Sequence, residues 1–170
     1  SCILAAKLCG EEPKGTVPHA AILLMGDTVK LAKVYDEQIP AEEPRIVLVD
    51  TFKDEAEETM RVAECLGEKL SGIRLDTPGE RGGVTPDLVR EIRWRLNTAG
   101  FNKVQVIATG GLTPERIKLM NEAGADVYGV GSYITSGTPR DMTMDIKMVN
   151  GKPVAKRGRL PGIVPNPRLE

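Results

Sequence analysis

The chain has 170 residues, of which 41% are hydrophobic, so it can bury one sizeable core and is not a disordered tail. Its 23 basic and 24 acidic residues nearly cancel and only 4% of residues are aromatic, which excludes nucleic acid and anionic membranes as expected partners. The sequence shows neither a charged leader followed by an apolar segment nor a long apolar span, so we expect a soluble, cytoplasmic protein.

The first ten residues, SCILAAKLCG, have the pattern of an amphipathic helix that ends at Gly10. No initiator methionine precedes them, so we expect that an upstream portion of the protein is absent. The three cysteines, Cys2, Cys9 and Cys65, are odd in number and lie in apolar, helix-like surroundings. We therefore expect buried thiols in a reducing compartment rather than a disulfide framework.

An alternation of strands and helices follows. Residues 15–18, GTVP, predict a strand, and residues 20–35 predict a long helix. Residues 45–50, RIVLVD, form a continuous apolar run, which is typical of a strand buried on both faces. Residues 53–70 then return to the helical period. This order predicts βα units with parallel strands.

The alternation continues towards the carboxyl terminus. We expect strands at residues 72–76, 104–109 and 126–131. Helices should begin at Thr85-Pro86 and Thr113-Pro114, because threonine is a good N-cap and proline suits the first helical position. The chain then contains about five βα units, whereas a closed α/β barrel needs eight. The predicted fold class is therefore α/β, an incomplete barrel similar to the TIM barrel.

The pattern changes near residue 140. Two short alternating runs flank Asn150-Gly151, which is the strongest short-range signal for a β-hairpin. A proline-rich tail follows. We expect residues 1–140 to form the partial barrel, and residues 141–170 to form a hairpin and tail that pack on the same domain.

In parallel α/β folds, functional groups gather where strands end at their carboxyl side. Those positions hold Asp50, Arg74, Asp76, Thr109, Gly110, Gly111, Gly129 and Gly131. Carboxylates can accept hydrogen bonds from ribose hydroxyls or hold magnesium, and glycine-turn N–H groups can bind phosphate. None of the predicted strands ends in a lysine, which Schiff-base chemistry needs. The single histidine cannot form a metal site with other histidines. These groups together suit a sugar phosphate.

Simpler interpretations stay open for several of these residues. A glycine pair after a strand is often only a tight turn, and Asp50 could merely cap the following helix. Asp76 follows Arg74 at strand spacing, so both side chains should project to one face of the sheet. His19 is the only histidine, and lone histidines are usually structural. Its position between GTVP and an apolar helix would nevertheless place it beside a strand-end ligand.

At these residues a family resemblance becomes specific. The segments GTVPHA, VDTFKDE, IRLDTPGERGG, ATGGLTPERI and VYGVGS, in this order, resemble the carboxyl-terminal barrel portion of the nicotinate phosphoribosyltransferases of the shorter archaeal and bacterial type. The resemblance implies an enzyme of NAD biosynthesis that joins nicotinate to phosphoribosyl pyrophosphate, giving nicotinate mononucleotide and pyrophosphate. It further implies Mg²⁺ as cofactor and ATP as co-substrate.

The resemblance also implies roles for individual residues. His19 matches the histidine that is phosphorylated when ATP is used, and Asp76 matches an aspartate near the ribose hydroxyls, so both are expected to be catalytic. Arg74 would lie beside the ribose and nicotinate. The glycines of the two turns, Gly110, Gly111, Gly129 and Gly131, would hold the 5′-phosphate. Asp50 and Thr109, from their strand-end positions, are expected to contact substrate.

Three alternatives remain at this point. Quinolinate phosphoribosyltransferase shares the fold, although the GTxPHA and LDTPGERGG patterns favour the nicotinate enzyme. A non-catalytic subunit or paralogue that binds a sugar phosphate is a second alternative. A third is another phosphate-binding barrel, such as a synthase or epimerase, which would want a lysine or a paired acid and base. Complete members of the resembled family carry an upstream domain, so we expect this chain to form homo-oligomers or to associate with the missing N-terminal portion, and not to turn over nicotinate alone.

Overall fold

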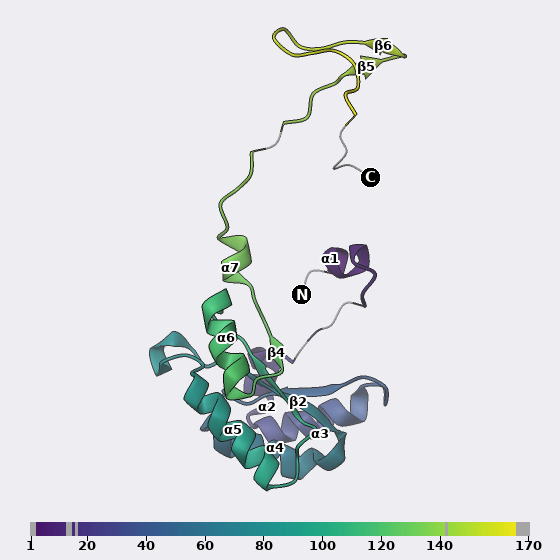
Figure 1. Ribbon diagram of the computed structural model, residues 1–170. Helices are drawn as coiled ribbons and strands as arrows, with labels where there is room; N and C mark the ends of the chain where they lie inside the picture. The colour runs from purple at the N-terminus through teal and green to yellow at the C-terminus, as the bar shows by residue number, and fades with distance from the viewer. Residues whose placement is uncertain (1–2, 13–14, 16, 142, 166–170) are drawn as a thin grey trace. The chain divides into compact units, whose positions relative to one another are not determined.

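The computed structural model describes residues 3–12, 15, 17–141 and 143–165. It contains two compact units, Ser1–Ser136 and Gly137–Glu170. The first unit holds the helices labelled in Figure 1 and, of the strands labelled there, β2 and β4. In chain order its elements are α1 (Ile3–Leu8), α2 (His19–Met25), α3 (Thr28–Gln38), β1 (Arg45–Leu48), α4 (Glu55–Leu66), η1 (Gly67–Lys69), β2 (Leu70–Leu75), η2 (Gly79–Arg81), α5 (Pro86–Thr98), β3 (Gln105–Ala108), α6 (Pro114–Ala123), β4 (Val127–Tyr128) and α7 (Ser132–Thr135).

The four strands of this unit form one parallel sheet in the order β1-β2-β3-β4. Crossovers between parallel neighbours are right-handed, and the strand order never reverses, so the connecting helices α4, α5 and α6 lie on the same face of the sheet. Each of these helices packs against the next. This winding is that of a barrel segment, because a doubly wound sheet reverses its strand order. It confirms the predicted α/β fold class.

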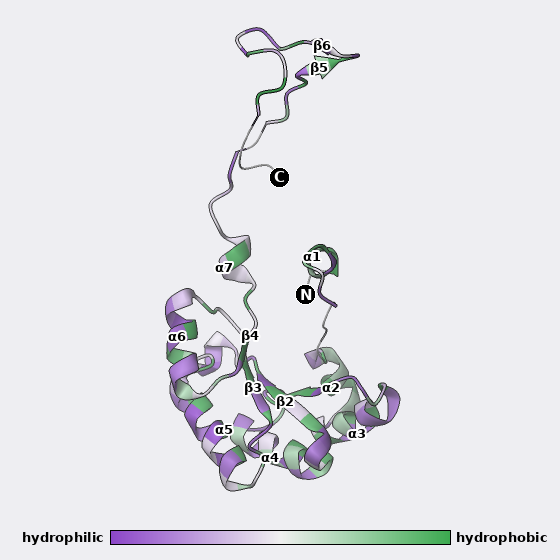
Figure 2. Cartoon of the chain, turned by 45° about the vertical axis from the view of Figure 1, so that its right-hand side comes forward, coloured by the Kyte–Doolittle hydropathy of each residue, from purple (hydrophilic) through white to green (hydrophobic). Residues whose placement is uncertain are grey.

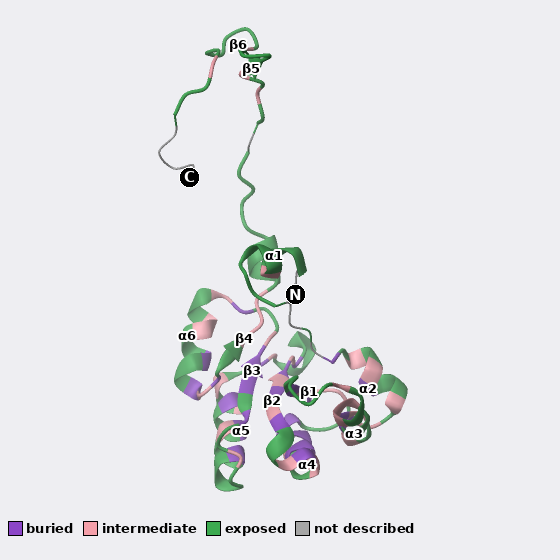
Figure 3. Cartoon of the chain, turned by 90° about the vertical axis from the view of Figure 1, so that its right-hand side faces the viewer, coloured by how far each residue is buried: buried purple, intermediate pink, exposed green. Residues whose placement is uncertain are grey.

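The core fills the space between the sheet and these helices. Alternate strand residues point towards the helices, and Val47, Ile73 and Val106 are almost completely buried there. The helices contribute apolar faces, including Val62 from α4 and Ile92 from α5, both fully buried. Figure 2 shows apolar strands among polar outer helix surfaces, and Figure 3 shows burial concentrated in β2, β3 and parts of α4 and α5. Each such side chain contributes about 1.5–3 kcal/mol by its removal from water.

Two predicted elements were wrong near the amino terminus. Gly15, Val17 and Pro18 are not in a strand, and Thr16 lies outside the described residues. Val17 is nevertheless buried, because it packs with α2 rather than in a sheet. The helix expected over residues 20–35 is two helices, α2 and α3.

The break between α2 and α3 has a local cause. Gly26 has a left-handed backbone with φ of 75°, and its N–H bonds to the carbonyl of Ile22, so α2 ends there. Asp27 then caps α3 by accepting a hydrogen bond from the backbone N–H of Lys30. The apolar periodicity runs across this Gly-Asp pair, and for that reason the prediction missed it.

Predictions for the first helix and the cysteines had mixed outcomes. Helix α1 ends just before Gly10, whose φ is 73°, as predicted, and none of its described residues is buried. Cys9 is exposed and Cys65 is partly buried, and both are free thiols. The expectation of a buried thiol is therefore wrong for Cys9, while Cys2 lies outside the described residues.

The second unit contains the predicted hairpin. Strands β5 (Met148–Val149) and β6 (Lys152–Pro153) pair antiparallel. Asn150 and Gly151 connect them with φ angles of 47° and 74°, the positive values that a two-residue type I′ turn requires. Residues 166–170 of the expected tail lie outside the described residues. The packing of this unit on the partial barrel stays a prediction.

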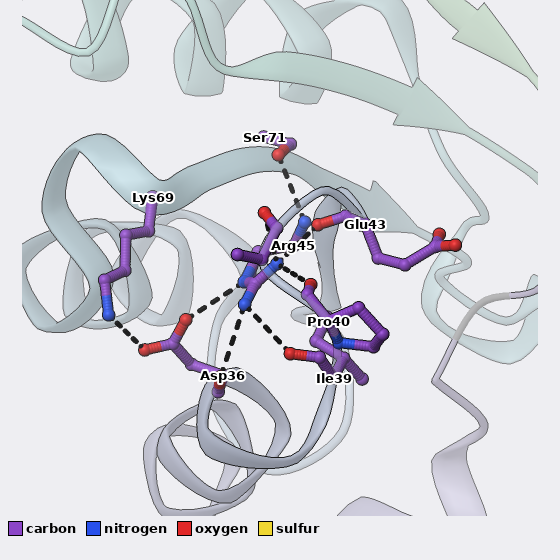
Figure 4. A network of polar contacts seen from close by, with 8 residues as sticks. Asp36, Ile39, Pro40, Glu43, Arg45, Lys69 and Ser71 are labelled. Atoms are coloured by element: carbon purple, nitrogen blue, oxygen red, sulfur yellow. Dashed lines mark hydrogen bonds and ion pairs between the residues drawn. The ribbon is translucent and has the colours of Figure 1, made fainter.

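The amino ends of the strands are secured by Arg45, the first residue of β1 (Figure 4). Its Nη1 donates to the carbonyl oxygens of Pro40 at 2.7 Å and Glu43 at 2.6 Å. Its Nε donates to Asp36 Oδ1 at 3.0 Å, and Lys69 donates to the other oxygen of that carboxylate. The side chain thereby ties the end of α3 and the loop before β1 to the start of the sheet.

Candidate active site at the carboxyl ends of the strands

The predicted site residues follow successive strands at the opposite end of the sheet. Asp50 lies two positions after β1, Asp76 directly follows β2, Thr109 directly follows β3, and Gly129 directly follows β4. The strand pairing extends into this region, since the backbone N–H of Thr109 bonds to the carbonyl of Leu75 at 2.9 Å. Because the strands are parallel, their carboxyl ends lie at the same end of the sheet, and these residues lie there together.

His19 and Asp50 form a pair across 31 positions of sequence. His19, the first residue of α2, places Nε2 3.1 Å from Asp50 Oδ2. The Asp50 side chain is 1% exposed, whereas that of His19 is 41% exposed. When the Asp50 carboxylate is ionised it can only accept, so Nε2 then carries the hydrogen of this pair, and in the neutral imidazole the lone pair lies on Nδ1. That nitrogen can accept a proton or a phosphoryl group.

The structure decides between the two interpretations of Asp50. Helix α4 is capped by Asp54, whose Oδ1 accepts from the backbone N–H of Ala56 at 3.0 Å. Asp50 therefore does not cap this helix. Its Oδ1 is buried and has no hydrogen-bond partner among the described residues. A buried carboxylate with one oxygen on His19 and one without a partner among the described residues is typical of a binding site, and the role of Asp50 in binding substrate stays a prediction.

Arg74 and Asp76 come from the end of β2. Arg74 pairs in register with Leu48 of β1 and Ile107 of β3, on the sheet face away from the buried helix-facing residues. Its Nη2 lies 3.9 Å from Asp76 Oδ2, and the side chains are 17% and 32% exposed. The pair places a guanidinium beside a carboxylate at the carboxyl end of β2, and a contact of either group with substrate stays a prediction.

The first glycine turn follows β3. Gly110 and Gly111 both have left-handed backbones, with φ of 89° and 59°. A Cβ at Gly110 would lie 3.3 Å from Asp76 Oδ1, so this glycine lets the turn approach the carboxylate. A Cβ at Gly111 would meet nothing within 4 Å. The backbone at Gly111 therefore borders open space that a ligand can occupy.

The second glycine turn follows β4, and its two glycines differ. A Cβ at Gly129 would lie 2.5 Å from Thr109 Cγ2, so glycine is required there for close packing. The Thr109 hydroxyl is itself held, because it donates to the carbonyl of Leu75 at 2.7 Å. Gly131 has φ of −124° and open space around it. Thr109 thus supports the second turn through packing, and its hydroxyl is already bonded within the chain.

A cavity of about 320 Å³ lies between the loop after β2 and the first glycine turn. It is lined by Asp76, Thr77, Pro78, Gly79, Gly82, Gly83, Gly110, Gly111 and Arg116. Sequence reasoning missed Arg116, although it lies in the quoted segment ATGGLTPERI. The available signal was its place in the first turn of α6, next to the Thr113 N-cap. Across the described residues, no helix is long and apolar enough to cross a membrane.

Comparisons with known proteins agree with this arrangement. The family described as quinolinate phosphoribosyl transferase, C-terminal domain, matches residues 10–145. The crystal structure of nicotinate-nucleotide pyrophosphorylase from Pyrococcus furiosus is similar with a TM-score of 0.77 and 47% identity, over 96% of this chain and 42% of that chain. Nicotinate phosphoribosyltransferase pncB1 of Mycobacterium tuberculosis is 29% identical over 166 residues, which cover 92% of this chain and 36% of that protein. The chain therefore spans less than half the length of these relatives.

These findings correct the resemblance drawn from the sequence. We expected a nicotinate phosphoribosyltransferase, but the matching family is that of the quinolinate enzyme, and the solved structure is more similar to this chain than the pncB1 protein is. The physical reason is that the quoted motifs lie at strand ends suited to ribose and phosphate, a chemistry that both enzymes share. Such motifs do not discriminate the pyridine acceptor. Because the match covers residues 10–145 of the 170, the chain belongs to the family of the quinolinate phosphoribosyl transferase C-terminal domain.

Proposed function

We propose that this chain forms the phosphoribosyl-binding part of a quinolinate phosphoribosyltransferase, a cytoplasmic enzyme of NAD biosynthesis. Quinolinate and phosphoribosyl pyrophosphate would give nicotinate mononucleotide, pyrophosphate and carbon dioxide. The observation that carries this proposal is the row of strand-end groups, His19 with Asp50, Arg74 with Asp76 and the two glycine turns, in a chain of this family.

The strand-end groups suit the ribose half of the reaction. When the bond between ribose C1′ and the pyrophosphate oxygen breaks, the sugar becomes oxocarbenium-like, and the pyridine nitrogen then bonds to C1′. Carboxylates such as Asp76 stabilise the positive charge that develops on the ring. The open backbone at Gly111 and Gly131 can receive the 5′-phosphate. In quinolinate, the bond to the 2-carboxylate then breaks, and the ring carbon takes up a proton.

We also propose Mg²⁺ as cofactor and ATP as co-substrate, and different residues would serve each of them. Among the described residues, no group of three or more His, Cys, Asp or Glu side chains could hold a metal ion. Asp50 and Asp76 could still support a Mg²⁺ carried mainly by the diphosphate of the substrate, which neutralises its charge as it leaves. If ATP is used, the Nδ1 of His19 would accept the phosphoryl group, which the contact of Nε2 with Asp50 supports.

The test for the acceptor uses the chemistry that differs between the two pyridines. The full enzyme, of which this chain would form the phosphoribosyl-binding part, is incubated with phosphoribosyl pyrophosphate, Mg²⁺ and quinolinate labelled in its 2-carboxylate. Released carbon dioxide is counted together with nicotinate mononucleotide. A parallel reaction contains nicotinate. Stoichiometric carbon dioxide and nucleotide from quinolinate support the proposal. Nucleotide from nicotinate, without turnover of quinolinate, would overturn it.

Binding by the isolated chain provides a second test. We expect ribose 5-phosphate to bind, and Gly111→Val to abolish that binding, because a branched side chain would block the approach to the backbone. Valine is also strained at the left-handed φ of 59°, so circular dichroism must show that the variant is folded before its affinity is compared. Glu122→Ala, an exposed change on α6, serves as the matched control. Equal affinity of Gly111→Val and the parent chain would show that the phosphate does not lie on this turn.

Association with further protein is also part of the proposal. Strands β1 and β4 each pair on one side only among the described residues, so the sheet has two open edges. Open edges favour pairing with another copy or with another portion of the protein. Analytical ultracentrifugation should show the isolated chain as more than a monomer, whereas a monomer at all concentrations would contradict this expectation.

A further inference from the structure

The loop that follows β2, residues 77–84, is attached at both ends to the first turns of two different helices. At its start, the buried hydroxyl of Thr77 donates to Oε1 of Glu55, the first residue of α4, at 2.7 Å. At its end, Nη2 of Arg116 on α6 donates to the carbonyl oxygen of Val84 at 2.8 Å. Both attachments join residues more than twenty positions apart.

The middle of this loop is bonded mainly to itself, since the backbone N–H groups of Gly82 and Gly83 donate to the carbonyl oxygens of Gly79 and Pro78 at 2.9 and 3.0 Å. Gly82 and Gly83 have left-handed backbones with φ of 95° and 70°, and a side-chain-free backbone has the greatest freedom to move. Arg81 reaches Glu55 Oε2 at 3.4 Å, but its side chain is 53% exposed. An exposed ion pair of this length contributes little to the stability of the loop. Because the bonds of the glycine N–H groups stay within the loop, the Arg116 bond to Val84 is the nearest firm attachment of the two glycines to a helix.

Arg116 is also part of the cavity wall. It faces the glycines of the loop, since a Cβ at Gly83 would lie 3.9 Å from its Nη2. It lines the cavity together with the Gly110-Gly111 turn. Its Nε is buried and has no partner among the described residues, an arrangement that costs stability. Stability alone does not explain an arginine that is used in this way.

We propose that Arg116 is a positioning residue for phosphoribosyl binding. Through Val84 it holds the 77–84 loop against the Gly110-Gly111 turn and so sets the width of the cavity between them. The planar guanidinium suits this task, because it can donate to a loop carbonyl and still present further N–H groups to the cavity. This inference rests on the proposed function for the identity of the ligand, whereas its claim about loop order does not.

The experiment compares the parent chain with Arg116→Ala by hydrogen exchange, with and without ribose 5-phosphate. In Arg116→Ala we expect the amides of Gly82 and Gly83 to exchange about tenfold faster without ligand, and the affinity to fall about tenfold, the equivalent of one charge-assisted hydrogen bond. Amides of β1 to β3 should keep their parental rates. Arg116→Lys should restore part of the protection, since it retains one donor for the Val84 carbonyl.

Arg90→Ala is the matched control, because Arg90 also lies near the start of a helix but bonds to the exposed Asp87. It should change neither loop exchange nor affinity. Unchanged loop exchange in Arg116→Ala, or faster exchange throughout the sheet, would overturn the inference, the latter because Arg116 would then act on the whole fold. Parent chain that fails to bind ribose 5-phosphate would instead count against the proposed function, and loop exchange without ligand still decides the role of Arg116.

Discussion

The two ends of the parallel sheet use the same residue types in opposite ways. At the amino end, Arg45 is almost completely buried, and its donors bond to Asp36 and to several loop carbonyls. At the carboxyl end, Asp50 has one buried oxygen without a partner among the described residues, and Arg116 has one such nitrogen. Buried polar groups with all their hydrogen bonds formed stabilise a fold. Buried polar groups without partners cost stability and are available to bind a ligand. The difference agrees with the general division of α/β barrels into a stabilising face and a catalytic face.

Cavity size alone would have pointed to the wrong end. A hollow of about 490 Å³ lies at the amino end, beside Arg45, Lys69 and Ser71, and it is larger than the cavity at Asp76. The Arg45 and Lys69 side chains that border it are both engaged with Asp36. The smaller cavity is bordered by glycine turns and by Arg116. The chemistry of the lining therefore favours the smaller cavity as the candidate site.

The largest loss of folding stability should follow from removing the Arg45 side chain at the amino end of the sheet. Arg45→Ala leaves the Asp36 carboxylate and several loop carbonyls without their donor, and we expect a loss of about 3 kcal/mol in the free energy of unfolding. Urea denaturation measures this loss. Arg95→Ala, which removes only a pair with Glu91 on the surface of α5, should cost less than about 0.5 kcal/mol. Equal losses in the two variants would contradict the stabilising role of the amino end.

A smaller loss of folding stability should follow from a substitution in the second glycine turn. Its two glycines, Gly129 and Gly131, allow a matched comparison. Gly129→Ala forces a methyl group against Thr109 Cγ2, so we expect destabilisation of about 1–3 kcal/mol. Gly131→Ala adds a methyl group in open space at an ordinary φ, so its stability should stay within about 0.5 kcal/mol of the parent. Thermal unfolding compares the two. The packing explanation fails if Gly131→Ala is the more harmful change.

At the carboxyl end, function and stability should separate. Asp50→Asn keeps the shape of the side chain but removes the charge that orients His19, so we expect phosphoribosyl transfer or ligand binding to fall about tenfold or more. The free energy of unfolding should change by less than about 1 kcal/mol, because an incompletely paired buried charge stabilises little. Paired measurements of binding and urea unfolding test this. A large loss of stability with intact binding would reverse the assignment of the two ends.

The smallest expected effect is the loss of folding stability at low pH. Lys69 and then Arg45 hold the pKa of Asp36 below its ordinary value by hydrogen bonding to the carboxylate. A lowered folded-state pKa stabilises the fold above the ordinary value, about 4, and this stabilisation disappears as the pH falls through the folded-state pKa. The urea midpoint should therefore fall below about pH 4, and less steeply in Asp36→Asn. Identical pH profiles of parent and variant would show that Asp36 does not contribute.

Local chemistry was predictable from the sequence wherever the deciding contacts span only a few residues. Thr85 and Thr113 cap their helices through bonds to the backbone three positions ahead, as predicted, and Asn150-Gly151 forms the predicted turn. The same kind of signal was present but overlooked at Gly26-Asp27, where one helix ends and the next begins. The carboxyl ends of the strands could likewise be located, because continuous apolar runs end there in polar residues or glycine.

Only the tertiary structure decided which of these residues meet. His19 and Asp50 are 31 positions apart, and Arg116 and Val84 are 32 positions apart, so no local spacing relates them. Their proximity follows from strand register and from helices wound on one face of the sheet, which sum many weak packing terms along the chain. The sequence by itself determined the elements, the strand-end polar residues and a chemistry suited to ribose phosphate. The tertiary structure decided which polar atoms are satisfied and which remain for a ligand, because satisfaction depends on contacts between residues far apart in the chain.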